Sequence, residues 1–154
     1  MDDRQLLTDI RLGLRHKELR PVYEVDTDRR RVSTRQRRLV VDDMGVVSGR
    51  ENLGQAIIMR LLTPTGELSA LAHPEYGSRL HELVGRQNTE TTRNLAKLFI
   101  LDSLQAEPRV EKVIETTVEP TPGRRDSVSV RLRIKPVGAT PTLTIGPFTL
   151  ELGR

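Results

Sequence analysis

The chain contains no cysteine and no tryptophan, and aromatic residues make up only 3% of its 154 positions. The absence of cysteine excludes disulfides, thiolate metal sites and cysteine nucleophiles, and it is typical of a protein made in a reducing compartment. With so few aromatic rings, the core has to be built from Leu, Ile and Val. A pocket lined with rings for sugars or bases is therefore hard to assemble.

Long apolar runs are also missing. No stretch approaches the roughly 20 apolar residues of a membrane span, and the first ten residues, MDDRQLLTDI, are acidic where a signal peptide needs a basic start. We therefore expect one soluble domain that acts in the cytoplasm and binds no membrane. The net charge is only +4, because 21 acidic residues nearly balance 25 basic ones. Net charge alone is thus a weak indication of nucleic-acid binding.

Residues 1–47 mix short apolar patches with dense charge and show no single period. We predict an N-terminal arm here, with a short helix or loose segment followed by extended segments. Within it, residues 29–38 (RRRVSTRQRR) hold six arginines in ten positions. This run could bind phosphate, but no aromatic residue is interleaved for base stacking, and Asp26 and Asp28 precede it. A solvated loop or a protein-contacting arm is the favoured interpretation.

Three helices are predicted after residue 47. Ser48 and Glu51 have the spacing of a capping box, so a helix over 50–62 should begin there, and Thr63-Pro64 should end it. Its apolar residues cover most of its faces, which indicates burial on most sides. A second helix over 78–84 is closed by a glycine, and a third over 89–106 ends before Pro108.

After Pro108 the apolar period changes from 3.6 to 2, which indicates strands. Segments 113–119 and 127–135 flank a turn-rich loop and predict an antiparallel hairpin with one buried and one basic face. A last pair of strands is expected over 143–145 and 148–152, bent at Gly146-Pro147. Residues 48–154 are therefore predicted to form a single α+β domain, with three helices packed on a mostly antiparallel C-terminal sheet.

Metal and nucleophile chemistry find little support in the sequence. The only histidines are His16, His73 and His81, and no two of them have the i, i+4 spacing of zinc enzymes. No local motif supports a Ser-His-Asp triad, and Gly-rich phosphate loops are missing. We predict no metal, no cofactor and no catalytic residue.

A glycosidase needs two carboxylates flanking a sugar, and Glu67 and Glu75 are the candidates because both lie on predicted turns. A single nearby tyrosine is a poor platform for a sugar. The favoured alternative is that Glu67 caps the chain or forms an ion pair with an arginine such as Arg60 or Arg79.

The triplet Glu107-Pro108-Arg109 follows the longest predicted helix. The proline ends the helix and should leave Glu107 and Arg109 projecting from a rigid corner between helix and sheet. Such a corner is pre-organised for contact with a partner. The plainer alternative is a helix stop with a surface ion pair worth about 0 to 1 kcal/mol, and residue chemistry alone favours it.

The order of motifs along the chain adds a family resemblance. An apolar helix is followed by Leu62-Thr63, Gly66-Glu67, Tyr76-Gly77, a Leu-rich segment, a long apolar helix and the Glu-Pro-Arg triplet. This order resembles the small baseplate wedge proteins of contractile phage tails and contractile injection systems, including type VI secretion baseplates, a family often called lysozyme-like. The resemblance covers about residues 50 to 135, so the arginine-rich N-terminus and the tail depart from it.

The resemblance implies a structural protein and not an enzyme. Glu107, Pro108 and Arg109 would dock on the helical bundle of larger wedge subunits near the inner tube or hub, in several copies, about six, around the baseplate. An open sheet edge would receive strands of sheath subunits and so start the sheath. The protein would assemble in the cytoplasm into a phage tail-like particle. The rival classes are a peptidoglycan hydrolase, which needs an acidic pair in a cleft, and a nucleic-acid adaptor, which needs salt-sensitive phosphate binding.

Overall fold

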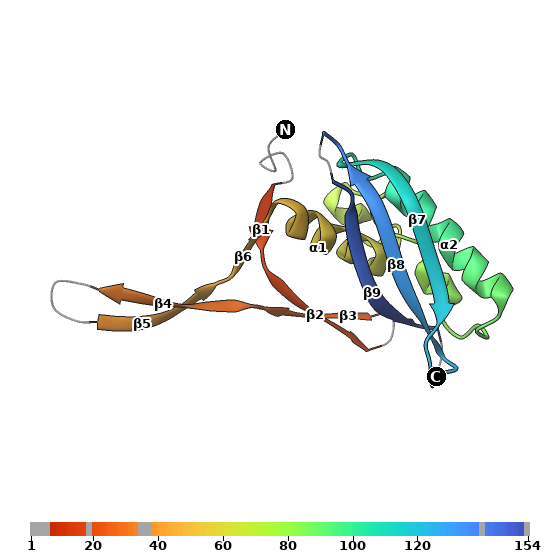
Figure 1. The fold of residues 1–154 in the computed structure, drawn as a ribbon, viewed down its shortest axis with the longest axis horizontal. Coiled ribbons are helices and arrows are strands. Elements are labelled where there is room, and N and C mark those ends of the chain that lie inside the picture. The colour runs from red at the N-terminus through yellow and green to blue at the C-terminus, as the bar shows by residue number, and fades with distance from the viewer. Residues whose placement is uncertain (1–6, 18–19, 34–37, 139–140, 153–154) are drawn as a thin grey trace.

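The computed structural model describes residues 7–17, 20–33, 38–138 and 141–152. The chain forms paired strands before residue 48 and a body of helices and sheet after it (Figure 1). The elements are β1 (Thr8–Ile10), β2 (Leu12–Lys17), β3 (Arg20–Val25), β4 (Thr27–Ser33), β5 (Arg38–Met44), β6 (Val46–Ser48), α1 (Gly49–Leu62), η2 (Ser69–Leu71), η3 (Leu80–Leu83), α2 (Glu90–Gln105), β7 (Val110–Pro120), β8 (Ser127–Pro136) and β9 (Leu143–Glu151).

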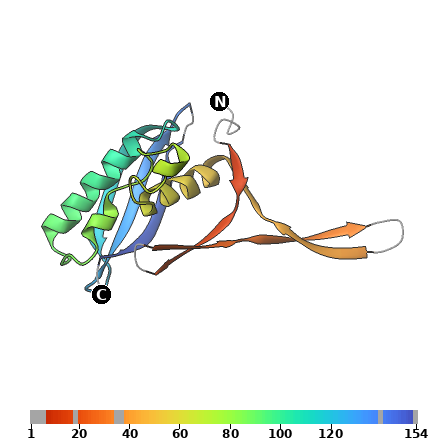
Figure 2. The same cartoon turned by 180° about the vertical axis from the view of Figure 1, so that it is seen from behind.

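The body is a two-layer structure in which both α-helices lie on one face of an antiparallel sheet of order β7-β8-β9 (Figure 2). Alternate residues of β8 point to the helices because side chains alternate across a strand. They meet apolar residues of α1 and α2 in one continuous core. The fully buried members with large side chains are Leu53, Ile57, Leu61, Leu80, Leu83, Ile100, Leu104, Val128, Leu132, Ile134, Leu150 and Leu152.

The other face of the sheet is polar, as the period-2 pattern predicts. Arg131 and Arg133 of β8 are exposed, while their neighbours Leu132 and Ile134 are buried. Arg133 forms an ion pair with Glu115 of β7 at 2.9 Å. The prediction of a hairpin with one buried and one basic face is confirmed.

The helix predictions are confirmed for α1 and α2 but wrong for residues 78–84. Only the short 3₁₀ segment η3 forms there, so the described part of the chain is α+β with two α-helices and not three. Ser78 is held outside a helix, because its amide donates to Thr63 O at 2.8 Å. Leu80 and Leu83 are three residues apart, a spacing that a 3₁₀ turn satisfies as well as an α-helix does. None of the helices in the described ranges is long and apolar enough to cross a membrane.

Two finer expectations also need correction. Ser48 does precede α1 as its N-cap, but its side chain makes no capping hydrogen bond. The reason is that Ser48 ends β6 and pairs there with Thr8. The two strands predicted around Gly146-Pro147 are the single strand β9, whose register against β8 shifts between Val130 and Leu132.

The N-terminal region consists of three two-stranded ribbons, β1–β6, β2–β3 and β4–β5, so the extended segments expected there are present. Of the short helix or loose segment expected before them, no helix is found in the described residues of this region. The ribbons meet at a closed ring of backbone hydrogen bonds. Arg11 N donates to Gly45 O at 2.8 Å, Gly45 N to Asp26 O at 2.7 Å and Asp26 N to Arg11 O at 3.0 Å. We call Arg11, Asp26 and Gly45 the three-ribbon junction.

The junction is tied to the body through Gln55 of α1. The Gln55 side-chain oxygen accepts from Leu12 N and its side-chain nitrogen donates to Ile10 O, both at 2.9 Å. These contacts bracket Arg11 on both sides. The ribbon β4–β5 then runs away from the body, while β2–β3 runs back toward the end of the sheet (Figure 1).

Candidate functional site

The loop between α1 and η3 brings most of the family motif residues together. Thr63 ends α1, and its hydroxyl donates to Met59 O at 2.8 Å. The far end of the loop returns beside it, because Thr65 N donates to Ser78 O at 3.0 Å and the Ser78 hydroxyl donates to Leu61 O at 2.5 Å. The loop is therefore closed by its own backbone and held against the end of the helix.

Gly77 occupies the tightest point of this loop. Its φ is 116°, and a Cβ there would stand 2.5 Å from Thr63 O, which no L side chain tolerates. Its carbonyl accepts a hydrogen bond from the buried Ser103 hydroxyl of α2 at 2.8 Å. Gly77 thus allows the loop to pass between the end of α1 and α2. The close approach of the two backbones explains why this position of the motif is a glycine.

An ion-pair cluster lies beside this crossing point. Glu107 follows α2 and is only 4% exposed. Its Oε1 accepts from Arg109 Nε at 2.7 Å, and its Oε2 lies 3.3 Å from an Arg60 terminal nitrogen. Arg60 is in the last turn of α1 and is itself 8% exposed. The pair therefore joins the ends of both helices inside the body.

Tyr76 completes the cluster. The Arg60 guanidinium carbon lies 4.5 Å from the centroid of the Tyr76 ring, a cation–π geometry. Arg60 Nε is buried and has no hydrogen-bond partner among the described residues, so the ring supplies part of the environment that water would otherwise provide. We call Arg60, Tyr76, Glu107 and Arg109 the motif centre.

Electrostatics hold the motif centre in one charge state. Burial raises the pKa of Glu107, but the hydrogen bond and charge of Arg109 and the charge of Arg60 outweigh it, so its pKa lies below the ordinary value. The pKa of Tyr76 is raised, first by burial and then by the Glu107 charge, against the opposing effect of the two arginines. The cluster therefore carries an ionised Glu107 and a neutral tyrosine at neutral pH.

The triplet Glu107-Pro108-Arg109 is placed differently from the prediction. Pro108 is exposed and the Arg109 side chain is 21% exposed, but Glu107 turns inward instead of projecting from the corner. The reason is the positive charge of Arg60, which lies on another helix. The partner-binding role of the triplet remains a prediction.

The other motif residues divide into two groups. Leu62, Thr63, Tyr76 and Gly77 lie at or beside the motif centre, with Leu62 packed in the core. Gly66 and Glu67 lie in the exposed turn of the loop.

Arg60, Ser78 and Ser103 were not identified as site residues from the sequence. A signal existed for Arg60, because it is the only charged residue in the apolar stretch 56–62, and a charge in such a place needs a partner. The expected pairing of Glu67 with Arg60 or Arg79 is wrong. Arg60 pairs with Glu107, and Arg79 pairs with Glu82 at 2.7 Å.

The candidate catalytic carboxylates lie at the surface of the described part of the chain. Glu67 and Glu75 are both exposed. Within the described ranges, one surface hollow is lined by residues 84–88 with 125–126 and another by side chains on the polar face of the sheet, and neither of these includes the two carboxylates. His73 and His81 are also exposed, and the His16 side chain lies outside the described residues. No cluster of three metal-ligating side chains occurs in the described ranges.

Comparison with known proteins gives a likeness among solved structures. Neither the family models nor the curated proteins yield a match to this sequence. Among solved structures, the chain is similar to the crystal structure of a proposed tail lysozyme from Geobacter sulfurreducens, with a TM-score of 0.55 and 21% sequence identity. The match covers 71% of this chain and 97% of that one. At this identity the likeness shows that the two proteins share a fold.

Proposed function

We propose that this chain is a structural component of the baseplate of a contractile phage tail or injection system, where it docks on larger wedge subunits. The observation that carries this proposal is the motif centre. Residues that give the sequence its resemblance to baseplate wedge proteins meet around one buried ion-pair cluster, in a fold shared with a protein named as a tail lysozyme.

The geometry of Arg109 fits a docking role. Its Nε binds Glu107, which Arg60 in turn holds from the other side. The terminal nitrogens of Arg109 make no hydrogen bond within the described residues, and the side chain reaches the surface. A guanidinium held in this way is pre-organised to bind a carboxylate or helix-end carbonyls of a partner. In this proposal Glu107 and Arg60 position Arg109.

The same proposal assigns sheath initiation to the sheet. β9 is an edge strand, and no other strand of the described chain pairs with its outer edge. Sheath subunits would add a strand there through main-chain hydrogen bonds. Pro147 has no amide hydrogen, so strand addition would use the parts of β9 on either side of it.

The proposal includes no catalysis. Its support is the exposed turn position of Glu67 and Glu75, outside the two hollows described above. We expect the purified protein to leave peptidoglycan intact in a turnover assay. Hydrolysis that disappears in Glu67→Gln or Glu75→Gln would favour the hydrolase instead.

The docking role is tested by comparing two variants in the cells that produce the protein. Arg109→Ala removes a partly exposed group, and Ser103→Ala removes a buried hydroxyl that only serves the fold. Each is expected to cost about 1 to 2 kcal/mol of stability, which denaturation of the purified variants will check. Counts of sheathed particles by electron microscopy should fall sharply for Arg109→Ala alone. Normal particles would exclude the docking role, and equal losses would show that Arg109 acts only through the fold.

A further inference from the structure

The β4–β5 ribbon projects from the body without a layer to pack on (Figures 1 and 2). Its two strands pair over seven positions, from Thr27 opposite Met44 to Ser33 opposite Arg38. An isolated two-stranded ribbon is only marginally stable in water. The stability of the fold therefore does not explain why the chain has a ribbon of this length.

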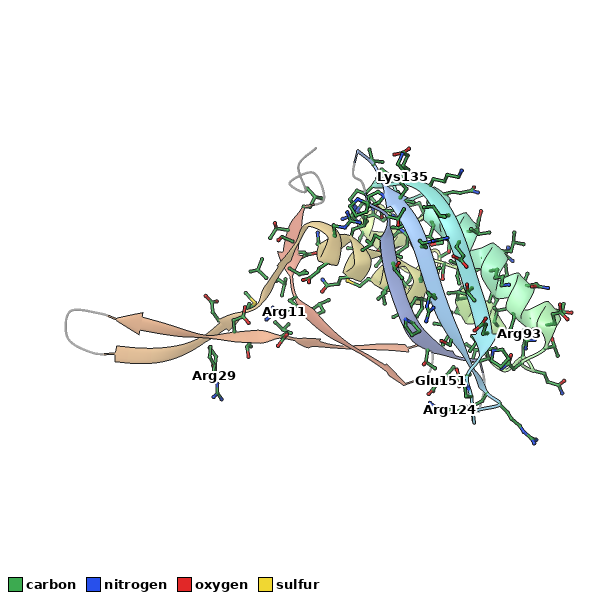
Figure 3. All side chains as sticks on the ribbon, in the orientation of Figure 1. Arg11, Arg29, Arg93, Arg124, Lys135 and Glu151 are labelled. Carbon is green, nitrogen blue, oxygen red and sulfur yellow. The ribbon has the colours of Figure 1, made fainter. Side chains whose placement is uncertain are left out.

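The root of the ribbon is held in a fixed direction. The Arg11 guanidinium, which lies at the root of the ribbon (Figure 3), donates to Asp26 at 2.8 Å and to Asp28 at 2.5 Å. A Cβ on Gly45 would stand 2.6 Å from an Arg11 terminal nitrogen, so the Arg11 side chain packs closely against the Gly45 backbone. Together with Gln55, these contacts fix where the ribbon points. Such pre-organisation lowers the entropy lost on binding.

The charges of the ribbon are divided between root and outer part. Acidic residues occur only near the root, where Arg11 binds two of them and Arg29 lies 3.6 Å from Asp42. Residues 30–41 contain five arginines and no Asp or Glu. The register sets Arg30 opposite Val41, Arg31 opposite Val40 and Val32 opposite Leu39, so basic and aliphatic positions lie close together there. The outer part of the ribbon is therefore basic in sequence and contains no carboxylate of its own.

Exposed apolar side chains are concentrated near the same root. Ten large hydrophobic side chains of the described residues are exposed, and five of these fall within residues 7–46. They are Leu7, Ile10, Val25, Met44 and Val46. Single exposed hydrophobics are common, but several near one junction are typical of a surface that a partner covers.

We propose that the β4–β5 ribbon and its root form a docking arm for a protein subunit that presents carboxylates beside an apolar strip. The arginines would pair with the carboxylates and the aliphatic residues would cover the strip. Nucleic acid matches this surface less well, because it offers phosphates without an apolar strip and residues 26–44 contain no aromatic ring for base stacking. The arm does not depend on the baseplate role.

The test is photo-crosslinking of the full-length protein in the cells that make it. A photoreactive residue replaces Ser33 in β4, and a matched control replaces Leu98, which is 58% exposed on α2. Mass spectrometry then identifies the crosslinked peptide. We expect Ser33, and not Leu98, to crosslink a carboxylate-rich peptide of a different protein.

Charge reversal sharpens the test. Arg30→Glu with Arg31→Glu should reduce the crosslink yield at least about tenfold, because like charges then face each other. Arg125→Glu, an exposed change in the loop between β7 and β8, should leave it unchanged. Replacing a carboxylate of the crosslinked peptide by lysine should restore the yield in the reversed variant. Melting curves will show that each variant folds.

Four results would overturn the docking arm. They are a crosslink to a second copy of this chain, a crosslink to nucleic acid, no crosslink at Ser33 above that at Leu98, and a yield that charge reversal does not change. Particle assembly is not part of the measurement. Failure of the arm and failure of the baseplate proposal are therefore distinguishable.

Discussion

The body and the ribbon region of this chain are held together by different forces. In the body, apolar residues of α1, α2 and the sheet are removed from water in one core, and the motif centre lies at its margin. Among the described side chains of residues 7–47, only Val47 is a buried large hydrophobic. The ribbons rely instead on backbone pairing, Arg11 and Gln55. Burial of apolar area dominates stability, so the body should carry the free energy of folding while the ribbons provide a surface.

The two regions also use buried and exposed charge differently. Arg60 and Glu107 are enclosed, so each depends on the other to avoid an uncompensated buried charge. Arg11 and its two aspartates are open to solvent, where ion pairs contribute little to stability and mainly set geometry. Changes to Arg60 or Glu107 should therefore strongly destabilise the protein, and changes at the junction should mainly redirect the ribbon.

The largest effect is expected for Gly77→Ala in the body. The added Cβ would collide with the backbone of Thr63 and Pro64, and the φ of 116° is unfavourable as well. We expect a loss of about 4 kcal/mol or more in the free energy of unfolding, measured with denaturant. Gly66→Ala is the control, because its φ is 89° but its nearest contact would be at 3.8 Å. It should cost about 1 to 2 kcal/mol, and equal losses would show that the close approach is unimportant.

Glu107→Gln should have the next largest effect. It leaves Arg60 buried without its counter-charge, which typically costs about 3 to 5 kcal/mol. The control is Glu111→Gln, whose carboxylate pairs with Lys135 at the surface (Figure 3) and should contribute less than about 1 kcal/mol. Denaturant unfolding of both variants will show whether Glu107 stabilises the fold through a buried ion pair or forms only a weak surface pair at the end of α2.

The same pair has a defined pH dependence. The pKa of Glu107 is lowered in the folded state, so its stabilisation is complete above the unfolded value of about 4.3 and is lost as pH falls through the lower, folded value. The stability difference between the wild type and Glu107→Gln should therefore be constant near neutral pH and shrink in acid. A difference that grows as pH falls would contradict the lowered pKa.

Gln55→Ala tests the link between the two regions and should have a smaller effect. Two hydrogen bonds to the backbone of Ile10 and Leu12 are lost, at about 1 kcal/mol each. We expect faster amide hydrogen exchange at Leu12 and in the ribbons, with α2 and β8 unchanged. Gln105→Ala, at the exposed end of α2, is the control. Uniformly faster exchange across the body would show that the ribbons are part of the same cooperative unit.

The smallest effect on stability is expected from shortening the ribbon. Replacing residues 30–41 by Asn-Gly would keep Arg29 opposite Asp42 and close the hairpin with a favourable turn. The free energy of unfolding should change by less than about 0.5 kcal/mol, because no core contact is removed. A larger loss on thermal or denaturant unfolding would mean that the ribbon supports the body and is more than a surface.

Periodic segments could be predicted from the sequence, and the exceptions have physical causes. α1, α2, β7 and β8 were predicted because each buries one regular set of side chains. Residues 78–84 were taken for a helix because Leu80 and Leu83 fit that spacing, but Ser78 is committed to the backbone of Thr63 and Leu61. The single strand β9 was divided in two because Gly146-Pro147 breaks the pattern locally while pairing with β8 continues across it.

The candidate site was predicted only in part. Glu107, Pro108 and Arg109 were singled out because a proline after a long helix leaves a sharp corner. The motif residues Tyr76 and Gly77 were noted only through a family resemblance. In the structure the Tyr76 ring lies against the Arg60 guanidinium, and Gly77 leaves free the space that a Cβ would take beside Thr63 O. Both roles depend on the ends of the two helices being in place.

The sequence by itself determined which residues could be buried and where α1, α2, β7 and β8 lie, because apolar periodicity, glycine and proline act over neighbouring residues. Tertiary structure alone decided the direction of Glu107 and the junction of Arg11, Asp26 and Gly45. In both cases the interacting groups come from segments far apart in the chain. A carboxylate turns inward only where folding has delivered a buried cation, and three ribbon ends share hydrogen bonds only once they meet.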